Sequence, residues 1–517
     1  MRRLLPFLIP IFALGGRAEV TLAPLFADHA VLQQGRPVPV WGRAAPGENV
    51  SVTFRDQTAT ATADQDGRWI VYLDPLRPGA PADLIVSGKN TIRREDILVG
   101  DVWICSGQSN MEFMVWGPPG DVYGVDHADE EVAAAHYPLI RHFKIERDPG
   151  DRPPAQVHGS WAVCSPATVG KFTAVGYFFA RDLQRRTEAP IGLINSSWGG
   201  SPVESWMSAA ALASDPAFAV VRERWREALA AYPTPAAYEK AHAEFKKAEA
   251  AAIKEWLHAP PGSKRTTLVK LGEVYQHMPH GPDDPFAPEV LFDTMIEPII
   301  PYGLRGVLWY QGESNAGHPT EYHALFAALI TDWRRRWGQG DFPFYWVQLP
   351  NFGPTDPDGT DWPRLREGQA QTLSLPHTGM AVTIDVGNRD DAHPRNKQEV
   401  GRRLALIAGH EIYGVPGGWS GPMFKAAERE GAAMRVHFAH VNGALVTRGQ
   451  PPPAFAVAGA DRRFFPAAAR IDGDTLLVSA PEVTAPVAVR YAWTNAPDAS
   501  LFDSIGLPAA PFRSDDW

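Results

Sequence analysis

A chain of 517 residues is longer than one hydrophobic core usually serves, so we expect several domains. Its composition, 44% hydrophobic and 21% charged, is that of an ordinary globular protein. The net charge of −10, without a long run of Lys or Arg, argues against nucleic acid and anionic membrane surfaces as partners. The 17 Trp residues mildly favour a carbohydrate ligand, because an indole ring stacks well on a sugar ring.

The N-terminus is typical of a secretory signal peptide. Two arginines at positions 2 and 3 are followed by an apolar stretch and then by small residues up to Ala18. The stretch is too short to span a bilayer, and no later segment reads as a membrane span. We therefore expect a secreted or periplasmic protein whose first 18 residues are removed.

The only two cysteines are Cys105 and Cys164. An oxidising compartment would permit a disulfide, but two cysteines do not make a disulfide framework. Because both lie beside apolar residues, buried free thiols are the favoured prediction.

Residues 19–97 are expected to form an N-terminal β-domain. Val52 and Phe54 alternate with polar residues, and a turn at residues 64–67 separates two strand-like runs. This pattern predicts a β-hairpin within a small β-sandwich.

Strands then alternate with helices. Short apolar runs predict strands at residues 102–105, 191–194, 306–310, 344–347 and 380–384. Apolar residues at helical spacing predict helices around residues 172–183, 322–333 and 400–407. The alternation indicates an α/β domain with a parallel sheet and helices on both faces.

This α/β domain is interrupted once and followed by more strands. Residues 207–289 are rich in Ala, Glu and Lys and predict a solvated helical insertion, whereas residues 414–517 predict a C-terminal β-domain. The expected order is a signal peptide (1–18), an N-terminal β-domain (19–97), the first part of the α/β domain (98–206), the insertion (207–289), the second part of the α/β domain (290–413) and a C-terminal β-domain (414–517).

Polar or small residues follow four of the predicted strands directly. The four segments are residues 106–111 (SGQSNM), 197–201 (SWGGS), 311–315 (QGESN) and 390–394 (DDAHP). Ligands bind at the carboxyl ends of strands in open parallel sheets, so we expect these segments to converge on one edge. Packing alone does not require such a pattern.

The residue types in these segments suit acyl transfer, which needs a nucleophile, a base, an orienting acid and oxyanion donors. Ser109 follows a strand-to-helix turn and fits the nucleophile, although a helix cap is an equally good interpretation taken alone. His393 fits the base. Gly200, Asn315 and the Ser109 backbone N–H are the candidate oxyanion donors.

With these motifs in order, the sequence resembles the sialate O-acetylesterase family of SGNH hydrolases. The resemblance extends over about residues 20–517 and is carried by residues 100–112 (GDVWICSGQSNME), 198–206 (WGGSPVESW), 309–316 (WYQGESNA), 393–404 and 506–513 (GLPAAPFR). It implies a flavodoxin-like core, flanking β-sandwich-like domains and no metal or organic cofactor. It also implies that Ser109 is the nucleophile, that His393 is the base, and that Gly200 with Gln311 and Asn315 lines the oxyanion site.

The resemblance leaves the orienting acid open among three residues. Many SGNH enzymes have an Asp three residues before the His, which is Asp390 here, and we place it first. Members resembling this family often have it two residues before, at Asp391. Related acetylesterases with the Gln-Gly-Glu motif use its Glu, which is Glu313. A zinc site built from Asp390, Asp391 and His393 is a poor alternative, because no Cys or second His stands near them.

Three functions remain open from the sequence. The first is removal of O-acetyl groups from sialic acid, and the second is deacetylation of xylan or another polysaccharide. The third is a catalytically inert carbohydrate-binding protein, against which Ser109, His393 and a candidate acid argue together. The carboxylate of a sialic acid would suit an arginine, and Arg395, Arg402 and Arg513 are candidates. Nothing in the sequence indicates an oligomeric state.

Overall fold

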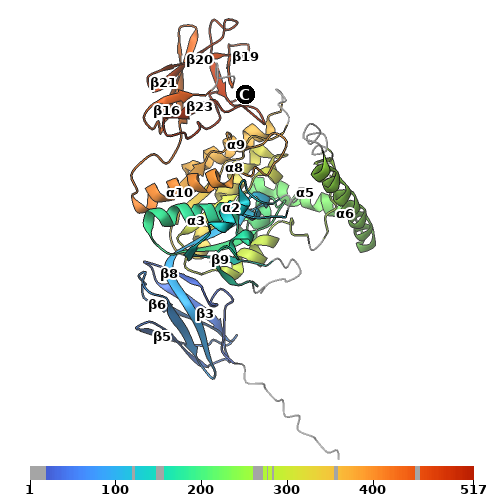
Figure 1. Ribbon diagram of the computed structural model, residues 1–517. Helices are drawn as coiled ribbons and strands as arrows, with labels where there is room; N and C mark the ends of the chain where they lie inside the picture. The colour runs from blue at the N-terminus through green and yellow to red at the C-terminus, as the bar shows by residue number, and fades with distance from the viewer. Residues whose placement is uncertain are drawn as a thin grey trace, which may run out of the picture.

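The computed structural model describes residues 19–118, 123–146, 157–259, 270, 272–275, 277–281, 284–353, 359–448 and 454–517. The expected signal peptide, residues 1–18, lies outside them. An α/β domain occupies the middle of the molecule, with one β-domain below it and another above it (Figure 1). None of the helices in the described ranges is long and apolar enough to cross a membrane.

The N-terminal β-domain has its strands in two groups. One sheet has the order β1-β3-β6, and in the other β4 pairs with β5 and β7. The expected hairpin across residues 64–67 is therefore wrong, because β5 and β6 lie in different sheets and the turn connects them. The strands are β1 (Thr21–Leu22), β2 (Val31–Gln33), β3 (Val38–Arg43), β4 (Asn49–Phe54), β5 (Gln57–Thr62), β6 (Arg68–Leu73) and β7 (Ala82–Ser87).

A single long strand connects this domain to the next. Strand β8 (Thr91–Gly107) pairs with β7 in its first half and with β11 and β12 in its second half. The alternating exposure of residues 91–96 gives way to continuous burial from Ile97 onward, as expected when a strand passes from a half-exposed sheet into a covered one. The expected boundary after residue 97 falls inside β8, and Figure 1 shows the strand running from one domain into the other.

The central sheet of the α/β domain has the strand order β10-β9-β11-β8-β12-β13-β14. All neighbours are parallel except β10, which pairs with β9 in antiparallel orientation, so the sheet is mixed and not wholly parallel as expected. The strands are β9 (Tyr137–Lys144), β10 (Trp161–Cys164), β11 (Ile191–Ser197), β12 (Gly306–Tyr310), β13 (Phe344–Val347) and β14 (Thr378–Ala381).

Helices cover both faces of this sheet, as expected. Val307 and Trp309 of β12 pack in the hydrophobic cluster that contains residues of α8, whereas Leu308 and Tyr310 pack in the cluster that contains residues of α3 and α10. The alternation of strand side chains thus builds a core on each side. The helices are α1 (Ser109–Glu112), α2 (Ala128–Ala133), α3 (Ala174–Thr187), α4 (Ala209–Leu212), α8 (Pro319–Trp337), α9 (Asp361–Gln371) and α10 (Lys397–Tyr413).

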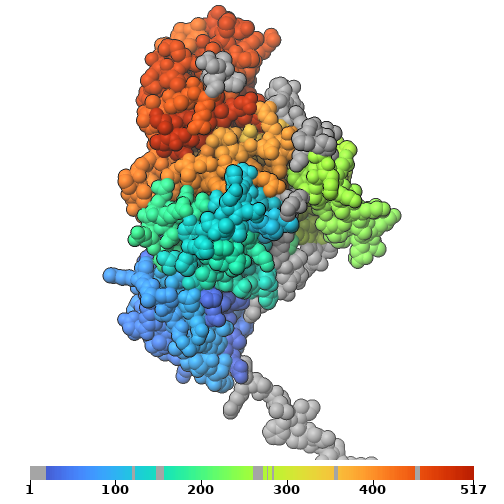
Figure 2. Space-filling view, in the orientation of Figure 1, coloured from blue at the N-terminus to red at the C-terminus, as the bar shows by residue number. Residues whose placement is uncertain are grey.

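The segment expected as a helical insertion contains two longer helices, α5 (Ala219–Ala230) and α6 (Pro235–His258). Pro235 occupies the first turn of α6, and the Thr234 side chain caps it by accepting from the Ala237 N–H. Only Phe245, Ala252 and Trp256 of α6 are buried. The insertion stands out beside the α/β domain (Figures 1 and 2).

The C-terminal strands form two four-stranded sheets, with the orders β15-β16-β21-β20 and β19-β18-β22-β24, and a short pair, β17-β23. Arg366 of α9 is fully buried and donates to the carbonyls of Leu349 and Pro350 on its own domain and of Thr494 and Asn495 on this one. Its guanidinium therefore ties the two domains together. The strands are β15 (Met423–Glu430), β16 (Ala433–Ala439), β17 (Leu445–Thr447), β18 (Phe455–Ala458), β19 (Phe464–Pro466), β20 (Ala468–Asp472), β21 (Thr475–Ser479), β22 (Ala488–Tyr491), β23 (Leu501–Asp503) and β24 (Phe512–Arg513).

Both cysteines are buried free thiols, which confirms the prediction. Cys105 lies in β8 and Cys164 in β10, and burial raises the pKa of both thiols.

Candidate active site

Three of the four polar segments begin side by side at one edge of the central sheet. Gly107, the last residue of β8, is paired with Ser197 of β11 on one side and with Tyr310 of β12 on the other. The segments that continue from these strands contain Ser109, Gly200 and Glu313. The convergence expected from the sequence is therefore present, and the parallel register of the three strands produces it.

Gly107 allows the chain to turn sharply before the candidate nucleophile. Its φ of +131° favours glycine, and a Cβ atom at this position would lie 2.2 Å from the carbonyl oxygen of Tyr310. Ser109 follows as the first residue of the short helix α1. The turn thereby places the Ser109 hydroxyl just beyond the sheet edge.

His393 meets Ser109 across a long distance in the sequence. The imidazole Nε2 and the Ser109 Oγ are 2.8 Å apart, which is hydrogen-bond distance. The ring of Phe113 lies nearly parallel to the imidazole, with centroids 6.4 Å apart and an interplanar angle of 24°. The His393 side chain is 29% exposed, so the pair is open to a ligand.

Asp391, and not Asp390, lies beside the imidazole. The Asp391 Oδ1 is 3.5 Å from His393 Nδ1 and accepts a 2.8 Å hydrogen bond from the His393 backbone N–H. Within the described ranges no hydrogen bond or ion pair joins Asp390 to His393; the Asp390 N–H instead donates to Asn388 Oδ1. A tight turn from Asn388 to Asp391 explains the difference, because it presents only its last residue to the imidazole.

Glu313 lies beneath the site. Its Oε1 accepts a 2.6 Å hydrogen bond from the Asn110 amide, and its Oε2 is buried without a partner among the described residues. Burial raises the pKa of Glu313, while the nearby His393 and Lys397 oppose that rise. The structure therefore brings two of the three candidate acids to the site, Asp391 at its surface and Glu313 below.

Two hydrogen bonds hold the turn at residues 199–200. The Glu112 carboxylate accepts a 2.9 Å hydrogen bond from Gly199, and Ser314 Oγ donates a 2.8 Å hydrogen bond to the Gly200 carbonyl. These contacts hold the turn at residues 199–200 against Ser109. No hydrogen bond within the described ranges uses the N–H of Gly200 or of Ser109.

Hydrogen bonds occupy the Gln311 amide, which was expected to line the oxyanion site. The Gln311 amide nitrogen donates to the Ser201 carbonyl and to Asn315 Oδ1, so both of its hydrogens are occupied. Asn315 in turn accepts from the Val203 N–H and donates to Glu204. The two buried amides hold the loop after Gly200 in place, and Gln311 is not free to bind an oxyanion.

An open pocket of about 580 Å³ extends from His393 toward the insertion. The loop of residues 386–396 forms much of its wall, and Trp256 and Leu257 at the end of α6 form another part. Of the three candidate arginines, Arg395 lines the pocket and donates to the Gly124 carbonyl at 2.6 Å. Arg402 pairs with Glu399, and Arg513 pairs with Glu367. Nothing in the sequence of the insertion predicted that Trp256 and Leu257 would line the pocket.

The insertion also supplies a side chain against the Gly200 turn. A Cβ atom on Gly200 would lie 3.0 Å from the ring of Phe286, so the ring closely approaches this glycine. The Phe286 backbone N–H donates to Asp284, which also contacts His280.

Sequence reasoning missed two buried residues below the site, Asn110 and Lys397. The sequence could have indicated Lys397, because it lies three residues before Val400 on the apolar stripe of α10. A buried Lys on such a stripe is rare. No group of three or more His, Cys, Asp or Glu residues that could hold a metal ion occurs in the part of the chain that the structure describes.

Comparisons with known proteins place this arrangement in a class. The family described as "Carbohydrate esterase, sialic acid-specific acetylesterase" matches residues 287–408. The crystal structure of a carbohydrate acetylesterase from Xanthomonas citri is 38% identical, with a TM-score of 0.78, and the match covers 96% of this chain and 100% of that one. The protein is therefore a carbohydrate esterase, a carboxylic ester hydrolase with an α/β core.

Two mammalian proteins are similar to this chain along most of their length. The mouse sialate O-acetylesterase is 29% identical over 94% of this chain and 93% of its own length. The human sialate O-acetylesterase is 28% identical over 94% of this chain and 90% of its own length. The chain belongs to the carbohydrate acetylesterases and is similar along most of its length to sialate O-acetylesterases.

Proposed function

We propose that this protein removes O-acetyl groups from sugars through an acetyl-enzyme intermediate on Ser109. The 2.8 Å contact between Ser109 Oγ and His393 Nε2 carries the proposal, because a nucleophile and its base need this distance. As Oγ bonds to the acetyl carbonyl carbon, its proton passes to Nε2. The bond from that carbon to the sugar oxygen then breaks, and the sugar oxygen takes the proton.

Water completes the cycle by the same route in reverse. His393 takes a proton from water as its oxygen bonds to the acetyl carbon. The bond from Ser109 Oγ to that carbon then breaks, acetate leaves, and Oγ takes the proton from Nε2. We assign Asp391 to orient the imidazole through Nδ1; its 3.5 Å distance is long, and such contacts often tighten only when substrate is bound.

The Ser109 and Gly200 N–H groups are our assignment for the oxyanion donors. Both N–H groups lack a partner within the described ranges, and the Gly199–Gly200 turn lies close to Ser109: a Cβ atom on Gly199 would be 3.4 Å from Ser109 Cβ. Fixed backbone donors stabilise the charge that develops on the carbonyl oxygen. The Asn315 amide retains one further hydrogen beside its bond to Glu204.

Sialic acid is the first candidate for the acetylated sugar. The matching family and the curated relatives carry that name. Arg395 lines the pocket, and its guanidinium, which also donates to the Gly124 carbonyl, has the chemistry to pair with a sugar carboxylate.

A neutral acetylated polysaccharide is the second candidate, and the charges of the pocket favour it. Asp126, Asp390 and Asp391 line the pocket together with Arg389 and Arg395, and Arg389 is already paired with Asp498. A negatively charged sugar would approach three carboxylates.

Acetate release from O-acetylated sialic acid and from acetylated xylan, measured side by side, distinguishes the candidates. If sialic acid is the substrate, Arg395→Met should raise its KM about tenfold or more, since a charge-assisted pair is lost. Hydrolysis of a neutral chromogenic acetate should change little in the same variant. Turnover of acetylated xylan with none of acetylated sialic acid would keep the esterase and replace its substrate.

The acyl pocket is expected to be small, because Gly199 approaches Ser109 closely and Phe286 lies against Gly200. Acetate esters should be hydrolysed faster than butyrate esters, with each methylene changing kcat/KM by roughly 10- to 200-fold. Phe286→Ala should reduce that preference in a chain-length series of chromogenic esters. Faster hydrolysis of octanoate than of acetate by the unaltered enzyme would contradict an acetylesterase.

A further inference from the structure

A buried lysine lies beneath the Ser109–His393 pair. Lys397, the first residue of α10, is 0% exposed, and its Nζ donates a 2.5 Å hydrogen bond to Asn110 Oδ1. The ammonium also lies 4.7 Å from the ring centroid of Phe113 and 5.4 Å from that of Tyr310, where aromatic faces favour a cation. Burial lowers the pKa of Lys397 to about 7, while Glu313 and Asp391 favour its charged form.

Asn110 connects the two halves of the proposed catalytic pair. Its Nδ2 donates to Glu313 Oε1 at 2.6 Å and to the Ala392 carbonyl at 2.8 Å. Asn110 directly follows Ser109, and Ala392 directly precedes His393. One side-chain amide therefore links the nucleophile turn to the histidine loop.

The three partners of this amide specify one orientation. As an ammonium, the form that Glu313 and Asp391 favour, Lys397 is only a donor and requires the amide oxygen to face it. Glu313 and the Ala392 carbonyl are acceptors and require the nitrogen. A flipped amide would place its NH₂ against an ammonium and its oxygen against a carboxylate. Lys397 thus stabilises the orientation in which Asn110 can hold the histidine loop.

We propose that Lys397 is a positioning residue, which orients the Asn110 amide and thereby sets the distance between Ser109 and His393. The proposal rests on the proposed Ser109–His393 chemistry. Lys397 is fully buried and acts without touching the substrate. Since a displacement of about 1 Å can cost on the order of 10² in rate, a loose histidine loop should be costly.

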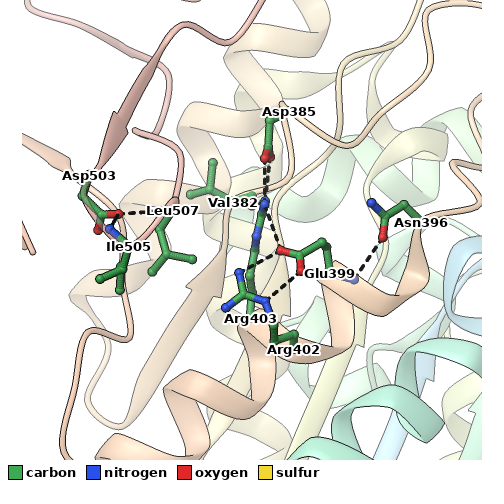
Figure 3. Close-up of polar contacts among 9 residues, drawn as sticks. All are labelled: Val382, Asp385, Asn396, Glu399, Arg402, Arg403, Asp503, Ile505 and Leu507. Atoms are coloured by element: carbon green, nitrogen blue, oxygen red, sulfur yellow. Dashed lines mark hydrogen bonds and ion pairs between the residues drawn. The ribbon is translucent and has the colours of Figure 1, made fainter. Parts of the chain in front are cut away.

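Other contacts hold α10 in place without Lys397. The Asn396 side chain accepts a 3.1 Å hydrogen bond from the Glu399 N–H at the start of the helix. Arg403 forms a two-point ion pair with Asp385, at 2.6 and 2.7 Å, and donates to the Val382 carbonyl (Figure 3). A substitution of Lys397 should therefore leave α10 docked, so its effect on catalysis is measurable.

The test is a double-mutant cycle between Lys397→Met and Asn110→Leu, with kcat and KM measured on a chromogenic acetate. Each single variant should lower kcat by about 10²-fold with KM within about twofold. The double variant should be no slower than Asn110→Leu alone, because Lys397 acts only through that amide. Lys397→Gln, which keeps an N–H donor, should lose less than Lys397→Met and serves as the second variant if Lys397→Met does not fold.

Arg402→Gln is the matched control on the same helix, because it removes only a partly exposed ion pair with Glu399. Its kcat should be unchanged. Two results would overturn the positioning role. The first is a kcat within threefold of the unaltered enzyme for folded Lys397→Met or Lys397→Gln. The second is a double variant in which the losses of the two single variants multiply. Ser109→Ala, assayed in parallel, separates the proposed function from the proposed role of Lys397. If Ser109→Ala stays active, the proposed function fails. If it is inactive, the double-mutant cycle tests the role of Lys397 alone.

Discussion

Ser109→Ala is expected to lower kcat by on the order of 10⁶-fold and to leave the Tm unchanged. Loss of the nucleophile of a catalytic serine removes the covalent route entirely, and a residual rate comes only from binding and oxyanion stabilisation. Among the described residues the hydroxyl makes its hydrogen bond to the partly exposed His393 alone, so the fold should not depend on it. Chromogenic acetate hydrolysis and a thermal melt measure the two effects.

Ser106→Ala provides a matched control for this variant. Ser106 lies in the same motif, is fully buried and has no hydrogen-bond partner for its hydroxyl within the described ranges. Its activity and Tm should both stay close to those of the unaltered enzyme. Activity of more than a few per cent in a folded Ser109→Ala variant would rule out Ser109 as the nucleophile.

Asp391→Asn is expected to show the second-largest loss, roughly 10⁴-fold in kcat. An amide in place of the orienting carboxylate favours the wrong imidazole tautomer while it preserves shape. Kinetics on the same chromogenic acetate measure the loss.

Two further amide variants complete this comparison. Glu313→Gln should lose less, since the new amide oxygen can still accept from Asn110. Asp390→Asn should stay near the unaltered rate, because no hydrogen bond or ion pair within the described ranges joins Asp390 to His393, whereas Asp391 contacts it. If Glu313→Gln proved the slowest of the three, the buried glutamate would replace Asp391 as the orienting acid.

Strand and helix periodicity predicted much of the α/β domain. The strands at residues 306–310 and 344–347 begin and end where the apolar runs do. The hairpin at residues 64–67 failed because local turn chemistry cannot show that β6 pairs with β3, which lies farther back in the chain. The antiparallel orientation of the edge strand β10 could not be predicted either, since periodicity says nothing about strand direction.

The candidate site could be predicted to the level of its segments but not of its hydrogen bonds. The order of the motifs predicted that Ser109 and His393 lie together, and the structure has them in contact. The choice between Asp390 and Asp391 depends on a turn at Asn388, which sequence spacing does not reveal. Gln311 was expected to line the oxyanion site, and only the structure shows that both its amide hydrogens are occupied.

Covalent labelling tests the central claim, that His393 activates Ser109 as the nucleophile, most directly. The enzyme would be treated with a serine-directed fluorophosphonate, digested, and its peptides examined by mass spectrometry. The geometry predicts one adduct on Ser109, formed in step with the loss of esterase activity, and much slower labelling of a His393→Ala variant. An adduct on another residue that accounts for the inactivation, or labelling of Ser109 at the same rate without His393, would contradict it.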